Sequence, residues 1–116
     1  MIIPVPLHPR RLRWRGFNQS VLLARQIGRA YNLPLDFFAL YRKMDTPPQT
    51  QLPEEERRKN MRGAFALSGK AAVKGKCLLL VDDVYTSGAT VNECSRVLKQ
   101  GGARQVFVLT LARAVY

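Results

Sequence analysis

Apolar residues recur along this chain in short runs that predict strands, separated by stretches in which they follow helical spacing. The predicted strands cover five runs, at residues 2–5, 36–41, 63–67, 77–81 and 106–111. The run at 77–81 is continuously apolar, as in a strand that is buried on both faces of a parallel sheet, and we expect 106–111 to be another buried strand.

Two helices are predicted between these strands. The first opens at Asn18 or Ser20, either of which can cap it, and ends at the Asn-Leu-Pro of residues 32–34. The second opens with a capping box of Thr90 and Glu93 and ends at a glycine pair. Together with the strands on either side of it, the second helix predicts a right-handed βαβ unit.

The polar stretch from residue 42 to residue 62 predicts a long mobile loop with room for one helical turn. Loops of this length inside a compact domain are uncommon and often serve as lids over a site. Arg57 is the candidate within this loop for closing over a bound anion. Its neighbours Glu54, Glu55 and Glu56 are candidates for a general base, although such clusters are more often solvated helix faces.

The composition of the 116 residues fits one folded domain, because a chain of this length buries about two-thirds of its unfolded surface. Hydrophobic residues make up 47%, which argues against a disordered tail. No apolar run approaches the roughly 20 residues of a membrane-spanning helix, and the start lacks a basic leader, so we expect a cytoplasmic protein. The two cysteines and the single His8 lack metal-knuckle spacing, and we expect free thiols.

The formal net charge of +11 favours anionic partners, namely nucleic acid, phosphate-rich small molecules or an anionic membrane, without choosing among them. Four arginines crowd the loop after the first strand: Arg10, Arg11, Arg13 and Arg15. Their planar guanidinium groups can grip phosphate oxygens in pairs, so they are candidates for a pyrophosphate site or a DNA-backbone site. A solvated basic loop explains them as well.

The segment after the 77–81 strand carries the clearest chemistry. It consists of Asp82, Asp83, Val84, Tyr85, Thr86, Ser87, Gly88, Ala89 and Thr90, and it leads directly into the second helix. Ligands of open α/β sheets bind beyond the carboxyl ends of the strands, where we expect the two aspartates to lie. The helix N-terminus, the small residues and the hydroxyl groups of Thr86, Ser87 and Thr90 predict a phosphate cradle.

Two carboxylates beside a phosphate site would repel an anion unless they bind something else. The vicinal hydroxyls of a sugar are suitable donors, and Mg²⁺ on a polyphosphate is a second candidate. The segment therefore fits a ligand with a terminal phosphate, a diol and a metal-bound pyrophosphate. This combination describes 5-phosphoribosyl-1-pyrophosphate (PRPP).

Three other interpretations fit part of this segment. The acidic strand of a nucleotide hydrolase would need a Gly-x-x-x-x-Gly-Lys-Ser/Thr loop, which the sequence lacks. The acidic pair of a receiver domain follows the first strand of its domain, and several more strand–helix units come after it. Here only one predicted strand follows the two aspartates. A solvated turn with a good helix cap needs no ligand, since capping residues are common.

Residues 78–90 closely resemble the signature of the type I phosphoribosyltransferases, with a mild departure at Tyr85, where aliphatic residues are commoner. The rest of the chain is similar to the competence protein F family (ComF, or GntX-like), from about Ile2 to Arg113. The matching residues are Pro4-Val5-Pro6-Leu7-His8, Arg15-Gly16-Phe17-Asn18-Gln19, Leu23-Ala24, Arg42, Thr46-Pro47-Pro48-Gln49, Leu52, Glu56-Arg57, Asn60 and Gly63-Ala64-Phe65.

The resemblance implies a Rossmann-like, three-layer α/β fold with a mostly parallel sheet, and PRPP binding with Mg²⁺ held through the ligand. Carried over by position, Asp82 and Asp83 would take the ribose 2- and 3-hydroxyls and act in catalysis. Residues 86–90 would hold the 5-phosphate, and the 6–17 segment matches the loop that holds pyrophosphate.

Two functions follow from the resemblance. An enzyme would transfer the phosphoribosyl group to a nitrogen nucleophile and release pyrophosphate, although no residue identifies the acceptor. The alternative is a non-enzymatic protein of DNA uptake, which would use PRPP as a ligand and bind single-stranded DNA or competence proteins.

The chain departs from the family at its start. Family members usually carry a cysteine-rich zinc-binding segment and a helical lead-in ahead of the transferase core, and neither precedes Ile2 here. We therefore predict no zinc site and a bare sheet face beside the first strand. Such a face predicts marginal stability or self-association.

Overall fold

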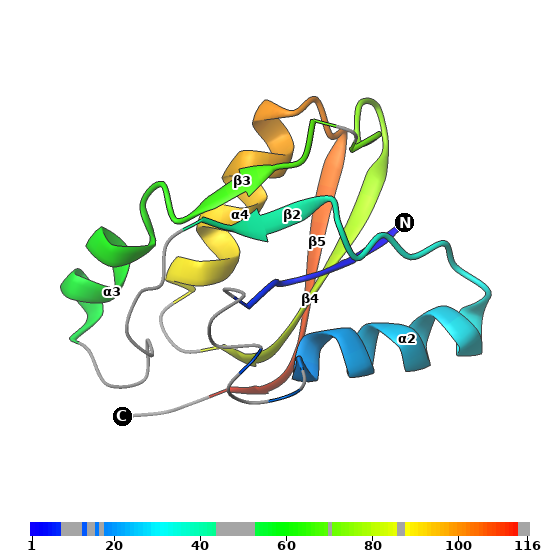
Figure 1. Ribbon diagram of the computed structural model, residues 1–116, viewed down its shortest axis with the longest axis horizontal. Helices are drawn as coiled ribbons and strands as arrows, with labels where there is room; N and C mark the ends of the chain where they lie inside the picture. Colours follow the sequence, from blue (N-terminus) through cyan, green and yellow to red (C-terminus); the bar gives the residue numbers. More distant parts are fainter. Residues whose placement is uncertain are drawn as a thin grey trace.

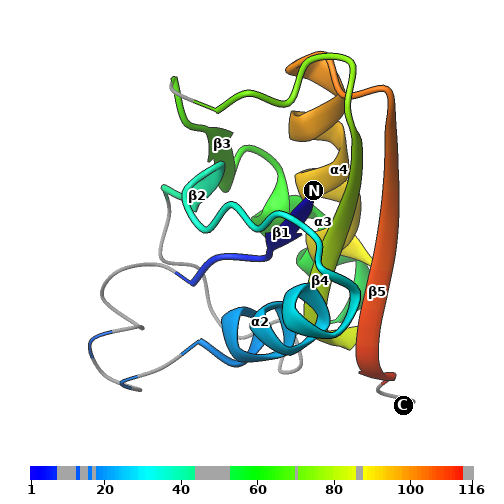
Figure 2. The ribbon, with the colours of Figure 1, turned by 90° about the vertical axis from the view of Figure 1, so that its right-hand side faces the viewer.

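The computed structural model describes residues 1–7, 13, 16, 18–43, 53–69, 71–85 and 88–113. Along the chain, the elements are β1 (Ile2–Pro4), α2 (Gln19–Tyr31), β2 (Leu40–Arg42), α3 (Glu54–Met61), β3 (Phe65–Leu67), β4 (Cys77–Tyr85), α4 (Ala89–Gln100) and β5 (Gln105–Arg113) (Figure 1). Three strands form a parallel sheet in the order β1-β4-β5, which Figure 2 shows side by side, and β2 pairs with β3 antiparallel. The expected α/β fold with a mostly parallel sheet is confirmed.

The sheet lies between two helical layers because alternate residues of its strands face opposite sides. On one face, Ile2 packs with Ala24 of α2 in a small buried cluster. On the other face, Leu78 and Leu80 join a larger cluster that includes Leu98 of α4 and residues of β2 and β3. Figure 1 shows this division, with α2 on one side of the strands and α4 with the β2–β3 pair on the other.

Asn18 fixes the start of α2, as the sequence predicts. Its side-chain oxygen accepts hydrogen bonds from the backbone N–H groups of Ser20 (2.9 Å) and Val21 (3.4 Å). Its amide nitrogen donates to the carbonyl oxygen of Val5 at 3.2 Å, so the cap also ties the helix to the chain just beyond β1. At the other end, Asn32 has a φ of 53°, and this left-handed conformation terminates the helix.

The predicted capping box of α4 is wrong. The helix begins after Gly88, whose φ of 84° lies in the left-handed region and which has no side chain to act as a cap. Thr90 lies inside the helix, and its hydroxyl contacts the sulfur of Met61 at 3.4 Å. The Glu93 carboxylate pairs with the Arg96 guanidinium one turn along the helix, and such a charged bond is stronger than a neutral cap.

Three other elements differ from the prediction. β2 begins at Leu40, later than expected, because the chain first meets β1 through a single parallel bridge between Leu35 and Ile2. The polar stretch holds a helix of eight residues, α3, rather than a single turn, while its residues 44–52 lie outside the described part of the chain. β4 continues to Tyr85, since its last residues still pair with β5.

Among the described strands, β5 lies at the edge of the sheet, and the predicted burial of this strand on both faces is wrong. Four of its apolar side chains are 40–66% exposed: Phe107, Val108, Leu109 and Leu111. The side chains of β1 itself are covered, because Ile2 and Ile3 are fully buried, whereas nearby Phe38 is 81% exposed and Tyr41 is 50% exposed. Within the parallel sheet itself, the exposed apolar side chains therefore lie on β5, at the edge opposite β1.

We expect the chain to self-associate through β5 at high protein concentration, because exposed apolar side chains on a sheet edge favour pairing with another copy. High salt should strengthen the association by screening repulsion between chains of net charge +11. Leu111→Lys should shift the sedimentation coefficient towards that of a monomer. Leu33→Lys, at a leucine 41% exposed outside β5, is the control. Wild-type chain that sediments as a monomer at every concentration would contradict this expectation.

Candidate functional site

The carboxyl ends of β1 and β4 lie side by side, because the two strands run parallel with Pro4 opposite Val81. Two carboxylates lie near the carboxyl end of β4: Asp82, which is only 8% exposed, and Asp83, which is half-buried. They lie within the strand rather than beyond it as predicted, since Asp82 still pairs with Thr110 of β5. Both nevertheless occupy the edge at which parallel α/β sheets bind their ligands.

Two hydrogen bonds orient the side chain of Asp82. Its Oδ1 accepts from the hydroxyl of Ser20 at 3.4 Å and from the backbone N–H of Asp83 at 2.9 Å. Ser20 is the second residue of α2, so the Asn18 cap that starts this helix also places the hydroxyl against the carboxyl group. Sequence reasoning considered Ser20 only as a cap, because the pairing of β1 with β4 that brings it to Asp82 is not a local signal.

Burial is the main cause that raises the pKa of Asp82 from its ordinary value of 3.8 to about 7, and the neighbouring charge of Asp83 raises it further. A carboxyl group with this pKa changes its charge near neutral pH. Such a group in an accessible site can accept a hydrogen bond when ionised and donate one when protonated.

Gly88 and the N-terminus of α4 follow closely after the two carboxylates, with only residues 86 and 87 between β4 and Gly88. Gly88 is buried, and its carbonyl oxygen accepts from the N–H of Asn92 at 2.8 Å, which closes the first turn of the helix. Figure 1 shows that α4 begins at the end of the molecule where β4 ends. The positive end of the helix dipole therefore faces the edge that carries Asp82 and Asp83.

The structure brings together part of the predicted site. At the carboxyl edge it places Asp82, Asp83, Gly88, Ala89 and Thr90. Val84 and Tyr85 are the last residues of β4 that pair with β5. The remaining loop residues Thr86 and Ser87 lie outside the described residues, as do Arg10, Arg11 and Arg15. Arg13 is exposed, and Arg57 lies in α3 beside the exposed Glu55 and Glu56.

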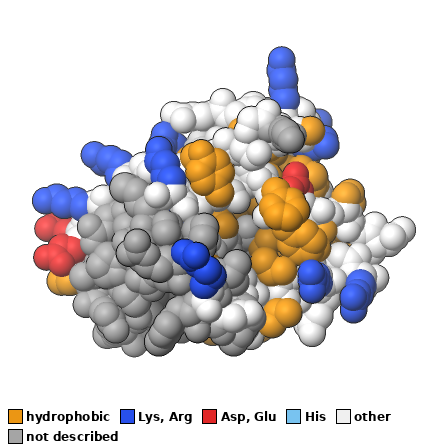
Figure 3. Space-filling model, viewed as in Figure 1, with side chains coloured by type: hydrophobic (Ala, Val, Ile, Leu, Met, Phe, Trp, Pro, Cys, Tyr) orange, Lys and Arg blue, Asp and Glu red, His pale blue; other side chains and the backbone are white. Residues whose placement is uncertain are grey.

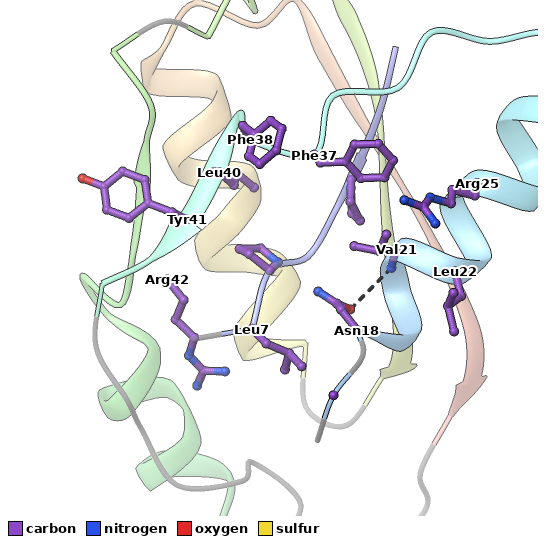
Figure 4. A pocket seen from close by; sticks show the side chains of 13 residues that line it. Leu7, Asn18, Val21, Leu22, Arg25, Phe37, Phe38, Leu40, Tyr41 and Arg42 are labelled. Carbon is purple, nitrogen blue, oxygen red and sulfur yellow. Dashed lines mark hydrogen bonds between the residues drawn. The ribbon is translucent and has the colours of Figure 1, made fainter. Parts of the chain in front are cut away.

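A pocket of about 610 Å³ that the sequence analysis does not predict lies along the outer side of β1. It is lined by Pro4, Pro6, Leu7, Gly16, Asn18, Val21, Leu22, Arg25, Phe37, Phe38, Leu40, Tyr41 and Arg42 (Figure 4). The aromatic run at residues 36–41 predicted a strand, but only its last two residues belong to β2. Phe37 and Phe38 line the pocket instead.

A second pocket, of about 490 Å³, lies beside the start of α4 and is more polar. Its lining comprises Met61, Arg62, Ala89, Asn92, Glu93 and Arg96. The hydrogen bond from Arg96 lowers the pKa of Glu93, so this carboxylate is ionised and already paired at neutral pH. It therefore stabilises the packing of α4 rather than offering a free base.

Metal-ligating and thiol groups are sparse in the described part of the chain. Among those residues, no three His, Cys, Asp or Glu side chains are placed to hold a metal ion. Cys77 is exposed and Cys94 is buried, both as free thiols, and burial raises the pKa of Cys94.

None of the described helices is long and apolar enough to cross a membrane.

The raised pKa of Asp82 predicts that the free energy of unfolding falls as pH rises. This carboxyl group binds its proton more tightly in the folded chain than in the unfolded chain, so its contribution is fully present below pH 3.8. The contribution is lost as pH increases through about 7, and the rise from 3.8 corresponds to roughly 4 kcal/mol at most. Asp82→Asn cannot ionise, so its melting temperature should rise relative to wild type between about pH 5 and pH 8.

The exposed Glu55 offers a matched control, because Glu55→Gln removes an ionisable carboxylate that lies on the surface of α3. Its melting temperature should follow that of the wild type at every pH. Parallel curves for Asp82→Asn and wild type would show that burial does not perturb Asp82.

Comparisons with known proteins identify a matching family and several relatives of this chain. The model of the phosphoribosyl transferase domain family matches residues 16–114. Competence protein F of Haemophilus influenzae is 40% identical over 114 residues, which are 97% of this chain and 50% of that protein. DNA utilization protein YhgH of Escherichia coli O157:H7 is 40% identical over 114 residues, or 98% of this chain and 49% of that protein.

A more distant relative, Competence protein ComFC of Streptococcus pneumoniae, is 32% identical over 111 residues, covering 96% of this chain and 47% of that protein. The chain thus spans about half the length of the curated relatives it matches. The family match includes α2, the acidic edge of β4 and the start of α4. This chain belongs to the phosphoribosyl transferase domain family, and its relatives are the competence protein F and DNA utilization proteins.

Proposed function

We propose that this chain binds PRPP together with Mg²⁺ and transfers the phosphoribosyl group to a nitrogen nucleophile, releasing pyrophosphate. One observation supports this above the others: two adjacent carboxylates, Asp82 and Asp83, lie at the carboxyl edge of a parallel sheet, just before a helix N-terminus. A carboxylate pair suits the diol of a ribose, and a helix N-terminus suits its 5-phosphate.

The two carboxylates act on the sugar in this proposal. The ribose 2- and 3-hydroxyls donate hydrogen bonds to them, and the Ser20 hydroxyl keeps Asp82 oriented. Such bonds favour the ionised form, so binding should lower the pKa of Asp82 from about 7 and release protons near neutral pH.

The transfer exchanges one bond at C1 of the ribose for another. The C1–O bond to pyrophosphate breaks and its electron pair leaves with the pyrophosphate, while the lone pair of the acceptor nitrogen forms the C1–N bond. C1 becomes electron-deficient between the two events, and the negative potential of Asp82 and Asp83 stabilises it. The arginines of the 10–15 segment, by their position in the family pattern, are the candidates for holding the pyrophosphate.

The residues at this edge are compatible with a magnesium complex of the substrate. Asp82 and Asp83 offer carboxylate oxygens, the type of ligand that Mg²⁺ and its bound waters accept, although two such groups do not form a complete protein site. The ion would therefore be held mainly by the substrate. When bound, it neutralises charge on the leaving pyrophosphate.

A second candidate function rests on the relatives, which are called competence or DNA utilization proteins. The net charge of +11 would suit single-stranded DNA, and PRPP would then serve as a ligand rather than as a substrate. Release of pyrophosphate that depends on an added acceptor distinguishes the enzyme from this alternative.

Replacing both carboxylates tests the proposed PRPP site. Hydrogen bonds to charged groups contribute about 1.5–3 kcal/mol each, so Asp82→Ala with Asp83→Ala should weaken Mg²⁺-dependent PRPP binding by about 2 kcal/mol or more. This corresponds to roughly 30-fold in the dissociation constant measured by calorimetry.

A double variant on α3 keeps the change in net charge the same. Glu55→Ala with Glu56→Ala also removes two carboxylates, both exposed, and should leave the affinity for PRPP unchanged. Equal losses in the two double variants would attribute the effect to net charge, and no loss in either would place the PRPP site elsewhere.

A further inference from the structure

The second pocket, between the end of α3 and the side of α4, is large enough for a small organic ligand. Its volume of about 490 Å³ falls in the range of roughly 300–1,000 Å³ that is usual for small-molecule sites. Its lining from α4 comes from positions 89, 92, 93 and 96, which follow one side of the helix. The end of α3 supplies another wall, and Figure 1 shows α3 beside the first half of α4.

Arginine side chains give this pocket a positive character. Arg62 and Arg96 both line it, and among its described lining residues Glu93 alone is acidic. The Glu93 carboxylate is already paired, because it accepts hydrogen bonds from Nε and Nη2 of Arg96. A guanidinium group has five N–H donors, so Nη1 of Arg96 can still donate to a ligand. Figure 3 shows Lys and Arg side chains at and above the position of α3, on the left of the molecule.

The groups around the pocket suit a phosphate ester. Guanidinium groups match the oxygens of a phosphate in geometry and charge, and Arg62 is exposed to a ligand that enters. The side-chain amide of Asn92, also exposed, adds a neutral donor. A phosphoryl group alone would fill a small part of the volume, and the side chains of Met61 and Ala89 offer apolar surface to an organic group.

Met61 connects this pocket with the proposed 5-phosphate site. Its side chain is buried, and its sulfur accepts a hydrogen bond from the hydroxyl of Thr90 at 3.4 Å. Thr90 belongs to the segment that the proposed function assigns to the 5-phosphate of PRPP. A hydroxyl group has one proton to donate, so Thr90 cannot donate to Met61 and to a phosphate oxygen at the same time. A ligand that packs against Met61 as it lies here therefore favours the conformation in which Thr90 donates to the sulfur.

We propose that the pocket between α3 and α4 binds a phosphate monoester, which opposes the binding of PRPP. Arg62 and Arg96 hold the phosphoryl group, Met61 and Ala89 contact the organic group, and the contact of Met61 with Thr90 carries the effect to the 5-phosphate site. Binding in the pocket rests on its lining alone, whereas the opposition to PRPP rests on the proposed function. The product of the proposed transfer is itself a phosphate monoester, so the pocket provides inhibition by product.

Phenyl phosphate is a suitable probe, because it is a phosphate monoester without the ribose diol that the two aspartates would bind. Added to the 116-residue chain at constant ionic strength, it should shift the backbone amide signals of residues 61–63 and 92–96 in NMR spectra. Arg62→Gln should raise the dissociation constant obtained from these shifts about tenfold or more, which is the loss expected for one charged hydrogen bond.

Lys59→Gln is the matched control, because it removes an equal charge from an exposed position of α3 that does not line the pocket. It should bind phenyl phosphate as the wild type does, and both variants should keep the wild-type melting temperature because both positions are exposed. An equal loss in the two variants would attribute the binding to net charge. Shifts confined to residues 86–90 would place phenyl phosphate in the 5-phosphate site. Either result would overturn the inference.

Calorimetric titration with PRPP and Mg²⁺ tests the opposition between the two ligands. Saturating phenyl phosphate should raise the dissociation constant of PRPP about fivefold, as expected for the loss of one neutral hydrogen bond. Met61→Leu removes the sulfur and keeps an apolar side chain of similar volume, so it should still bind phenyl phosphate and lose this effect. Competition that persists unchanged in Met61→Leu and Arg62→Gln would be direct competition at residues 86–90, and would overturn the role of Met61.

The pocket and the proposed function can fail separately in these experiments. Shifts at residues 61–63 and 92–96 that Arg62→Gln weakens, in a chain that does not bind PRPP, would support the phosphate monoester site and overturn the proposed function. PRPP binding without those shifts would overturn the pocket and leave the PRPP site intact.

Discussion

The parallel pairing of β1 with β4 is the contact on which the rest of the structure depends. It joins residues 2–4 to residues 79–81, and so brings the start of the chain next to the strand that carries the two aspartates. Ile2, Ile3 and Leu80 are fully buried by this pairing and by the helices on either face, so close packing holds the two strands together. Asn18 then fixes α2 to Val5, and the second residue of that helix reaches Asp82.

A buried carboxyl group at a strand end is an unfavourable feature for folding alone. The pKa of Asp82 near 7 shows that burial and Asp83 oppose its ionised form, so the chain would be more stable with a neutral residue there. Groups of this kind concentrate at functional sites, where a ligand supplies the interactions that the folded chain lacks. The hydroxyls of a bound sugar would do so, which connects the stability of the fold with the proposed binding of PRPP.

The sequence predicted the elements whose signals are local, and it failed where distant contacts decide. The apolar run at 77–81 predicted the start of β4, and the cap at Asn18 predicted the start of α2. The predicted capping box was wrong because the Glu93 carboxylate pairs with Arg96. The predicted burial of β5 was wrong because burial on both faces needs a neighbouring strand, and the described part of the chain places none on its outer side. The two aspartates lie within β4 rather than beyond its end, because β4 pairs with β5 further than its apolar run predicts. The pocket was missed because its lining comes from β1, α2 and the residues before and within β2.

The central claim is that PRPP binds at the carboxyl edge of β4, and amide chemical shifts test it most directly. The backbone amides of the chain would be followed by NMR while PRPP is added in the presence and absence of Mg²⁺. The account predicts the largest changes at residues 82–90 and in the first turn of α2 around Ser20, and predicts that they require Mg²⁺ at low PRPP concentration. Changes centred on β5 or α3, or none at saturating PRPP, would contradict it.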